Sequence, residues 1–225
     1  MIEAKEVSLT YHDGTQALKN VNITVRPGEL VYITGHSGSG KTSLLKLLIG
    51  SEYPTSGSLK VLGQTMKRGK DRRIRKLRKK IGPVFQEFKL IEGRTALENV
   101  MMGMRFLGIS PRKMKTEAIN ALTKVGLQHK IGSRVENLSW GESQRVAIAR
   151  AVARKPELIL ADEPTGNLDH DNAINILQIL NSFRDKHTAV VITTHATHLI
   201  ENQEDATYIR VNKGEVTIER SRTQA

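Results

Sequence analysis

One stretch decides the fold, Leu30-Val31-Tyr32-Ile33-Thr34-Gly35-His36-Ser37-Gly38-Ser39-Gly40-Lys41-Thr42, in which an apolar run passes directly into a glycine-rich loop. The eight residues from Gly35 match the phosphate-loop pattern G-x-x-x-x-G-K-[ST], and the apolar residues of 44–49 predict the helix that should follow it. Glycines let consecutive backbone N–H groups converge on phosphate oxygens, and the helix N-terminus adds its dipole. We therefore expect Lys41 to reach the β- and γ-phosphates of a nucleotide and the Thr42 hydroxyl to ligate Mg²⁺.

Two carboxylates follow the apolar segment Leu158-Ile159-Leu160-Ala161. Open α/β sheets bind ligands beyond the carboxyl ends of their strands, which is where Asp162 and Glu163 would lie. We expect Asp162 in the outer shell of Mg²⁺, bound through water, and Glu163 as the base that orients an attacking water. The alternative is a charged strand end in solvent, which the upstream phosphate loop disfavours.

A helix start is indicated within Leu138-Ser139-Trp140-Gly141-Glu142-Ser143-Gln144-Arg145. Ser139 and Glu142 have the S-x-x-E spacing of a capping box, and an apolar run over 146–153 follows them. The first N–H groups of a helix have no intrahelical partner, so the same feature binds anions.

The remaining segments predict an α/β fold with a parallel sheet covered on both faces. The first thirty-five residues predict antiparallel strands, with turns at Asp13-Gly14 and Pro27-Gly28. Residues 87–151 are expected to be mostly helical. Continuous apolar strands at 158–161 and 189–194 flank a further helix. The apolar face of that helix is expected to consist of Ile174, Leu177, Leu180 and Phe183.

Composition excludes several classes of protein. The chain has 225 residues, of which 38% are hydrophobic, and with its 18 glycines its apolar share is ordinary for a globular domain. No run approaches the roughly 18 apolar residues of a membrane-spanning helix. The first six residues contain no apolar export signal, so we expect a cytosolic protein. Without cysteine, disulfides, thiolate metal sites and thiol nucleophiles are excluded.

The net charge of +12 is concentrated in one segment. Residues 67–80 contain ten Lys or Arg and one Asp, which leaves only +3 for the rest of the chain. Three interpretations stay open: a solvated face of a surface helix with Ile74 and Leu77 as its thin apolar side, a contact with anionic lipid headgroups, or nucleic-acid binding. The segment contains no aromatic residue on which a base could stack, which disfavours the third.

Together these motifs resemble the ABC ATPase family, whose LSGGQ signature corresponds to residues 138–142, and the resemblance covers essentially the whole chain in the right order. It implies a P-loop NTPase fold, with a RecA-like parallel sheet, an N-terminal antiparallel β subdomain and an inserted helical subdomain. The implied organisation is one nucleotide-binding domain over 1–225, with its core at 1–86 and 152–225 and its helical subdomain at 87–151. A GTPase is disfavoured, since the nearest match to its Asn-Lys-x-Asp base reader, at residues 212–215, is expected to be a hairpin turn.

The resemblance also implies roles for single residues. Tyr11 would stack on adenine, Gln86 would sense Mg²⁺ and couple to a membrane partner, and His195 would contact the γ-phosphate. The ATP-binding set would comprise Tyr11, Gly35, His36, Ser37, Gly38, Ser39, Gly40, Lys41, Thr42, Ser43 and Gln86. The catalytic residues would be Glu163, His195 and Lys41, and Mg²⁺ would be held by Thr42, Gln86 and, through water, Asp162.

A second chain would complete the site in this family. Contacts with the ATP of the partner subunit would come from Ser139, Trp140, Gly141, Glu142 and Asp169. Trp140 departs from the family pattern because it stands where the first glycine of LSGGQ is expected, while Gly141 keeps the second glycine. We expect this ring to weaken or retune the closed dimer without abolishing it.

Within the family the chain is most similar to the subgroup of FtsE, LolD and MacB, and to FtsE above all, through Val84-Phe85-Gln86-Glu87-Phe88 and Arg94-Thr95-Ala96-Leu97-Glu98-Asn99-Val100. This similarity implies a homodimer that binds ATP and Mg²⁺ and works with a membrane partner resembling FtsX in cell division. The chain would lie on the cytoplasmic face of the bacterial inner membrane, at the division site. The alternatives are the ATPase subunit of a lipoprotein-releasing or macrolide-type transporter and a nucleic-acid-associated ABC ATPase.

Overall fold

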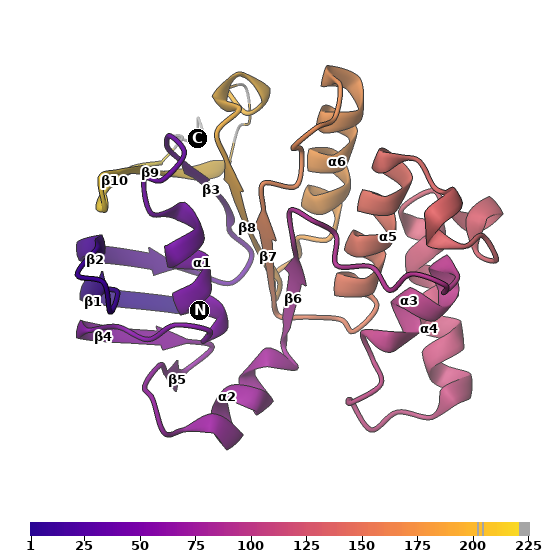
Figure 1. Ribbon diagram of the computed structural model, residues 1–225, viewed down its shortest axis with the longest axis horizontal. Coiled ribbons are helices and arrows are strands. Elements are labelled where there is room, and N and C mark those ends of the chain that lie inside the picture. The colour runs from indigo at the N-terminus through magenta and orange to yellow at the C-terminus, as the bar shows by residue number, and fades with distance from the viewer. Residues whose placement is uncertain (202, 204, 221–225) are drawn as a thin grey trace. The chain divides into compact units, whose positions relative to one another are not determined.

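The computed structural model describes residues 1–201, 203 and 205–220 (Figure 1). The chain forms two compact units, one made of Met1–Arg78 with the described residues from Arg184 onward, and the other of Lys79–Phe183. The predicted division into a core at 1–86 and 152–225 and a helical subdomain at 87–151 stays a prediction. Among the described residues, no helix is both long enough and apolar enough to cross a membrane.

The first unit contains an antiparallel sheet with strand order β2-β1-β4-β5. Its strands are β1 (Ile2–Thr10), β2 (Gln16–Val25), β4 (Ser56–Val61) and β5 (Gln64–Thr65). The turn from β1 to β2 is stabilised by the Asp13 carboxylate, which accepts a hydrogen bond of 2.9 Å from the backbone N–H of Thr15. The predicted turn at Asp13-Gly14 and the antiparallel pairing are therefore confirmed.

The same unit holds β3 (Leu30–Thr34), β8 (Ala189–Thr194), β9 (Ala206–Asn212) and β10 (Glu215–Arg220). β3 pairs in parallel with β8 on one side and with β9 on the other, while β10 returns antiparallel beside β9. The antiparallel pairing predicted for the first thirty-five residues is wrong for β3. All five of its residues are buried, which is typical of a strand inside a parallel sheet rather than of a strand with one solvated face.

Helix α1 (Lys41–Ile49) follows the glycine-rich loop as predicted and supplies apolar residues to the core of the first unit. Leu44 and Leu48 of α1 line one small internal cavity together with residues from both sheets. Those from the sheets are Ile2, Ala4, Ile23, Val25, Val31, Ile33, Val191 and Ile209. One continuous apolar core therefore holds the start of α1 at the end of β3.

The basic run contains helix α2 (Asp71–Arg78), which Figure 1 shows, and the apolar residues of this helix are buried. Ile74 and Leu77 are 1% and 4% exposed, and the other residues of the helix are exposed. Arg78 donates hydrogen bonds to the carbonyl oxygens of Ile49, at 3.0 Å, and Gly50, at 2.8 Å. These acceptors lie at the C-terminal end of α1, where unpaired carbonyls favour a cation. The helix and its thin apolar side are therefore as expected, and which of the three interpretations of its charge holds stays a prediction.

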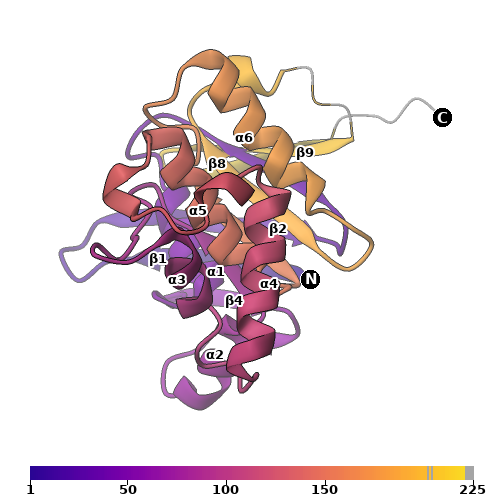
Figure 2. The same ribbon diagram turned by 90° about the vertical axis from the view of Figure 1, so that its right-hand side faces the viewer.

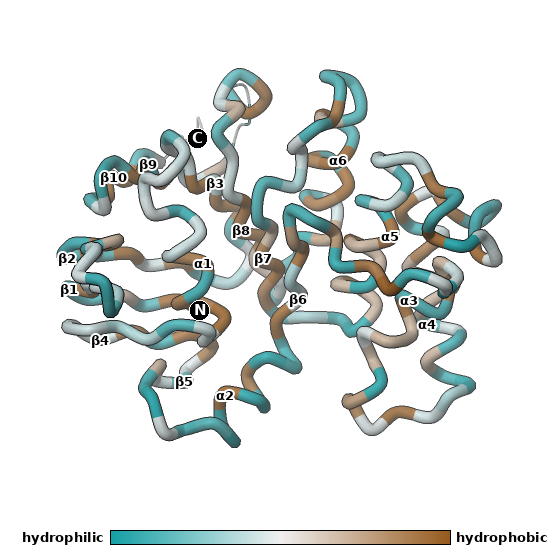
Figure 3. The backbone as a smooth tube through the Cα atoms, viewed as in Figure 1, coloured by the Kyte–Doolittle hydropathy of each residue, from teal (hydrophilic) through white to brown (hydrophobic). Residues whose placement is uncertain are grey.

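The second unit combines two parallel strands, β6 (Ile81–Val84) and β7 (Leu158–Asp162), with helices. The first residues of β7 are brown in the hydropathy view, in keeping with their burial (Figure 3). Helices α3 (Ala96–Met102), α4 (Pro111–Lys124) and α5 (Trp140–Val152) pack against one another (Figure 2). Short 3-10 turns occur at Gln128–Lys130 and Val135–Asn137 in this unit and at Thr197–Leu199 in the first.

Helix α6 (His170–Ser182) closes the second unit with an apolar stripe that differs from the predicted one. The buried residues are Ala173, Ile176, Leu177 and Leu180. Ile174 and Phe183, which were expected on this face, are only half-buried. The buried set follows the i, i+3, i+4, i+7 spacing of a helix face, whereas a strict spacing of three residues rotates around the helix.

The buried side of α2 predicts a sharp contrast between two neighbouring substitutions. Ile74→Ala should lower the free energy of unfolding by about 2–5 kcal/mol, because it leaves a cavity in the contact between α2 and the core. Arg73→Ala, on the exposed side, should change it by less than about 0.5 kcal/mol. Urea unfolding of both variants measures the difference, and equal effects would contradict the docked position of α2.

Candidate nucleotide site

The phosphate loop approaches other backbone segments so closely that only glycine fits at two of its positions. Gly35 has φ 150°, and a Cβ atom there would collide with the carbonyl oxygen of Val211 in β9. Gly40 has φ 117°, and its Cβ would lie 2.6 Å from the carbonyl oxygen of Ala17 in β2. These backbone conformations are rare for residues with a side chain. The glycines of the motif therefore also allow the loop to pack against the two sheets.

Lys41 is buried within this loop, with only 6% of its surface exposed. Its ammonium group donates hydrogen bonds to the carbonyl oxygens of Gly35, at 2.8 Å, and His36, at 3.1 Å. No side chain caps the N-terminus of α1, since the N-cap residue is Gly40. The buried Ser39 hydroxyl has no hydrogen-bond partner among the described residues. A buried cation, uncapped N–H groups and a hydroxyl in one loop fit a phosphate group.

Tyr11 lies next to the start of α1, and its expected contact with adenine stays a prediction. Its hydroxyl is 2.9 Å from the Ser43 hydroxyl. His195 follows β8 directly, and Thr194 pairs with Thr34 in the parallel register of β8 and β3. Since both strands run in the same direction, Gly35 and His195 leave the sheet at the same edge. The first unit therefore brings together the loop and the predicted γ-phosphate contact.

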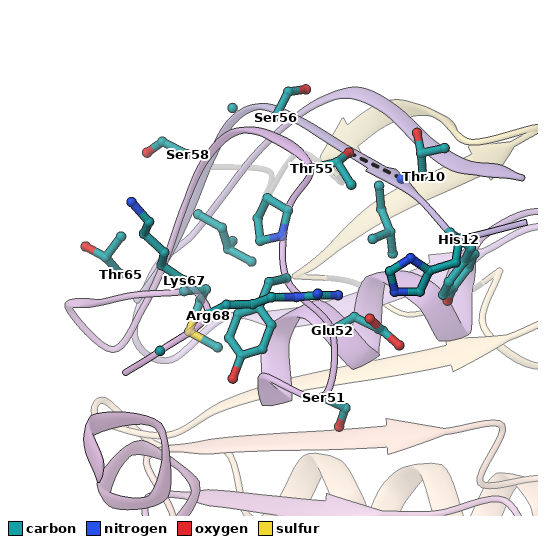
Figure 4. Close-up of a pocket in the computed structure, with 18 of the residues that line it drawn as sticks. Thr10, His12, Ser51, Glu52, Thr55, Ser56, Ser58, Thr65, Lys67 and Arg68 are labelled. Atoms are coloured by element: carbon teal, nitrogen blue, oxygen red, sulfur yellow. Dashed lines mark hydrogen bonds between the residues drawn. The ribbon is translucent and has the colours of Figure 1, made fainter. Parts of the chain in front are cut away.

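A pocket of about 940 Å³ opens beside Tyr11 (Figure 4). Figure 4 shows Arg68 extending across this pocket toward Glu52, with His12 on the far side. Lys67, Arg68, Glu52 and Asp71 all line it, so its fixed positive and negative charges balance. The excess positive charge of the basic run therefore lies outside this pocket, mostly on the exposed side of α2.

The second unit places the predicted carboxylates at the carboxyl end of β7. Asp162 is the last residue of the strand, and Glu163 follows it; both are half-buried. Val84 pairs with Ala161 in the parallel register of β6 and β7. Gln86 and Glu163 each come two residues later, so they leave at the same edge. Gln86 itself is exposed.

Glu163 begins a tight turn with an unusual backbone. Its φ of 45° is in the left-handed region, which residues with a side chain rarely adopt. The backbone N–H of Gly166 donates a hydrogen bond of 3.1 Å to the carbonyl oxygen of Glu163. The turn projects the glutamate at a fixed point just beyond the strand. A strained backbone at such a place is typical of a functional site.

The signature segment begins α5 as predicted. Ser139 is the N-cap, and the two hydrogen bonds of the capping box with Glu142 are both present, at 2.8 and 3.2 Å. The backbone N–H of Ser139 lowers the pKa of Glu142, and Lys130, 3.2 Å away, acts in the same direction. The capping box predicted from the sequence is confirmed.

Asp169 lies next to this helix start within the second unit. Its carboxylate caps α6 by accepting hydrogen bonds from the backbone N–H and the side-chain amide of Asn172, at 2.9 and 2.7 Å, and its pKa is lowered by these bonds. A Cβ on Gly141 would lie 3.7 Å from the side-chain oxygen of Asn172. Gly141 and Asp169, two residues expected to contact a partner's ATP, are therefore neighbours.

Trp140 is 46% exposed and makes two contacts within its own unit. Its indole N–H donates a hydrogen bond of 3.1 Å to the carbonyl oxygen of Gly166. Its ring meets the ring of Phe88 edge to face, with the centroids 4.6 Å apart. Arg150 of α5 donates hydrogen bonds to the carbonyl oxygens of Phe88 and Lys89. The motifs predicted neither the contacts of Trp140 with Phe88 and Gly166 nor the role of Arg150, because no spacing signal connects positions this far apart.

The predicted site residues thus fall into two sets. Tyr11, the phosphate loop and His195 belong to the first unit. Gln86, Asp162, Glu163, the signature residues and Asp169 belong to the second. Among the described residues, no group of three or more histidine and acidic side chains is placed to hold a metal ion. The expected ligand set for Mg²⁺ is of another kind, since it includes the hydroxyl of Thr42 and the amide of Gln86.

Comparison with known proteins identifies the family. The family model described as "ABC transporter" matches residues 18–166. The cell division ATP-binding protein FtsE of Bacillus subtilis is 38% identical over 200 residues, which are 89% of this chain and 88% of that protein. FtsE of Escherichia coli K12 is 41% identical over 203 residues, 90% of this chain and 91% of that protein.

Solved structures agree with the sequence comparisons. The dimeric structure of an ATP-binding cassette in a post-hydrolysis state, bound to ADP and Pi, superposes with a TM-score of 0.87 at 36% identity. It covers 99% of this chain and all of the other. The resemblance inferred from the phosphate loop, the carboxylate pair and the signature segment is therefore confirmed. The chain belongs to the ABC transporter family and is an ATPase of that family.

Proposed function

We propose that this ATPase is the nucleotide-hydrolysing subunit of an FtsEX-like membrane complex that regulates cell-wall hydrolysis during cell division. The observation that carries the proposal is the 38–41% identity to FtsE proteins over about nine-tenths of the chain. The geometry of both units supports it, since each set of predicted residues leaves its strands at a single edge.

ATP binding begins in the first unit. The phosphates enter the loop 35–42, where Lys41 exchanges its two carbonyl partners for phosphate oxygens and the uncapped N-terminus of α1 adds its dipole. The ring of Tyr11 stacks on adenine. Thr42, Gln86 and, through water, Asp162 would hold Mg²⁺, which supplies positive charge at the β- and γ-phosphates.

Hydrolysis needs two chains in this proposal. They bind two ATP molecules head to tail, so that each phosphate loop faces the signature segment of the other chain. Ser139 and Gly141 contact the partner's γ-phosphate, with Trp140, Glu142 and Asp169 beside them. Glu163 orients a water that attacks the γ-phosphorus and His195 contacts the γ-phosphate, and the bond to the leaving ADP breaks.

The product of this cycle is a conformational signal. Closure of the dimer moves the loop of Gln86, which contacts a membrane partner resembling FtsX, and hydrolysis resets it. The chain then acts on the cytoplasmic face of the bacterial inner membrane, at the division site. It is held there through its partner.

The basic surface, defined as the exposed side chains of Arg72, Arg73, Arg75 and Lys76 on α2, contacts anionic lipid headgroups beside the partner. The structure supports this part of the proposal because Ile74 and Leu77 face the core of the chain. The exposed side of α2 is therefore polar throughout, and Arg72, Arg73, Arg75 and Lys76 all point their charge outward. Each such residue near an anionic surface contributes about 1 kcal/mol of binding free energy.

Glu163→Gln tests the catalytic assignment. The amide keeps the shape of the carboxylate but cannot accept a proton, so the turnover number should fall by roughly 10²–10⁴-fold while ATP binding is retained. Steady-state phosphate release measures turnover, and equilibrium binding of a fluorescent ATP analogue measures affinity. An equal loss of turnover and of ATP affinity would show that Glu163 is not the catalytic base.

Capture of the partner tests the proposed function. Tagged Glu163→Gln protein, trapped with Mg-ATP in detergent-solubilised membranes, should co-purify with an integral membrane protein that has a few spanning helices and one large external loop. Capture of a lipoprotein-releasing or macrolide permease instead would assign the chain to a transporter and overturn the cell-division role. A nucleic-acid partner without a membrane protein would overturn the membrane complex altogether.

Vesicle binding tests the lipid contact. The four substitutions Arg72→Ala, Arg73→Ala, Arg75→Ala and Lys76→Ala should abolish co-sedimentation with vesicles that contain phosphatidylglycerol, and wild-type binding should weaken as salt is raised. A matched control removes four exposed charges from α4 through Arg112→Ala, Lys113→Ala, Lys115→Ala and Lys124→Ala. Equal loss in both variants, or duplex DNA binding that survives physiological salt, would contradict a specific lipid contact.

A further inference from the structure

Trp140 contacts two loops that come from distant parts of the sequence. One is the loop after β6, which contains Gln86 and Phe88, and the other is the turn after β7, which runs from Glu163 to Gly166. All of these residues belong to the second unit. The family pattern has glycine in place of Trp140, so neither contact follows from the motifs.

The loop of Gln86 is held from two sides. Phe88 and Lys89 have φ values of 55° and 52°, so two consecutive residues with side chains adopt the left-handed conformation. Such a backbone persists only where surrounding contacts stabilise it. Burial lowers the pKa of Arg150, and its guanidinium donates hydrogen bonds to both of their carbonyl oxygens. On the other side, the Trp140 ring packs on the Phe88 ring. Both Arg150 and Trp140 belong to α5.

The turn of Glu163 is attached to the same helix. The peptide N–H of Gly166 closes the turn on the Glu163 carbonyl, and the carbonyl oxygen of Gly166 accepts the indole N–H of Trp140. Strained φ values of 45° at Glu163 and 62° at Asn167 flank this attachment. The indole N–H of Trp140 therefore holds the Gly166 end of the turn that begins at Glu163.

We propose that Trp140 is a positioning residue that couples the loop of Gln86 to the turn of Glu163. Through Phe88, a displacement of the first loop moves the indole ring. Through Gly166, the ring moves the backbone on which the proposed catalytic carboxylate is mounted. An indole meets both requirements at once, because one edge packs on an aromatic ring while the N–H donates a hydrogen bond. Trp140 is not itself a catalytic residue in this account. The inference rests on the role of Glu163 in the proposed function.

Kinetics separate the two contacts of the ring. Trp140→Phe keeps an aromatic ring against Phe88 and loses the donor to Gly166, so the turnover number should fall by about 3- to 10-fold with the half-saturating ATP concentration nearly unchanged. Phe88→Leu should produce a similar fall. The double variant should be no worse than the more impaired single one, because residues that act as one unit have non-additive effects.

Fluorescence provides a readout that does not depend on activity. Trp140 is the only tryptophan in the chain, so the emission reports on this site alone. Phe88→Leu should increase quenching of that emission by acrylamide. ATP should alter the emission of the Glu163→Gln variant, in which the nucleotide persists. The matched control is Phe106→Leu, which removes an aromatic ring that is 79% exposed in the same unit and should change neither emission nor turnover.

Three outcomes would overturn the proposal. Additive losses of turnover in the double variant would show that the contacts act separately. A fall in thermal stability with turnover of the folded enzyme unchanged would show a merely structural role. If Trp140→Gly changed only the ATP concentration needed for dimerisation and left turnover unchanged, the ring would act at the contact with the partner subunit instead. If Glu163→Gln retains full turnover, the assignment of Glu163 fails, whereas the response of the emission to Phe88→Leu still tests the contact.

Discussion

Close backbone packing around the phosphate loop is the constraint on which the first unit depends. Gly35 and Gly40 lie against the carbonyl oxygens of Val211 and Ala17, so β9 and β2 both determine where the loop can run. The turn between β9 and β10 completes this arrangement, since the N–H of Gly214 donates to the carbonyl of Ser39, at 3.0 Å. Lys41 is buried as a consequence, and its ammonium group is satisfied by the loop itself. The loop is thus shaped for an anion by contacts far from it in sequence.

Helix α5 has the corresponding role in the second unit. Its first turn carries the capping box of Ser139 and Glu142, its tryptophan contacts the turn of Glu163, and its Arg150 holds the loop of Gln86. The apolar residues Val146, Ala147, Ile148 and Ala149 anchor the helix, with no exposed surface. A rigid, buried helix is a good support for two loops with strained backbones, because packed cores transmit displacement rather than absorb it. In the proposed coupling, the two loops respond to nucleotide and partner as one structure.

The excess positive charge of the chain lies outside the pocket beside Tyr11. The pocket beside Tyr11 contains balanced charges, and the basic surface lies on the outer side of α2, whose apolar residues are used by the core. Arg78 is an exception among the basic residues of α2, since it also stabilises the carbonyl ends of α1. A helix this basic can remain folded because its few apolar residues are fully buried, while the repelling charges point into solvent.

The sequence alone determined several features that depend on near neighbours along the chain. The phosphate loop and α1, the turn at Asp13-Gly14, the capping box of Ser139 and the buried side of α2 all follow from spacing within a few residues. Tertiary structure decided what depends on partners far apart in sequence. It placed β3 between two parallel neighbours, selected Ile176 rather than Ile174 for the buried face of α6, and brought Phe88 and Gly166 to Trp140. The physical reason is that local propensity and capping act over one turn or less, whereas packing selects among distant segments by shape and burial, which no local pattern encodes.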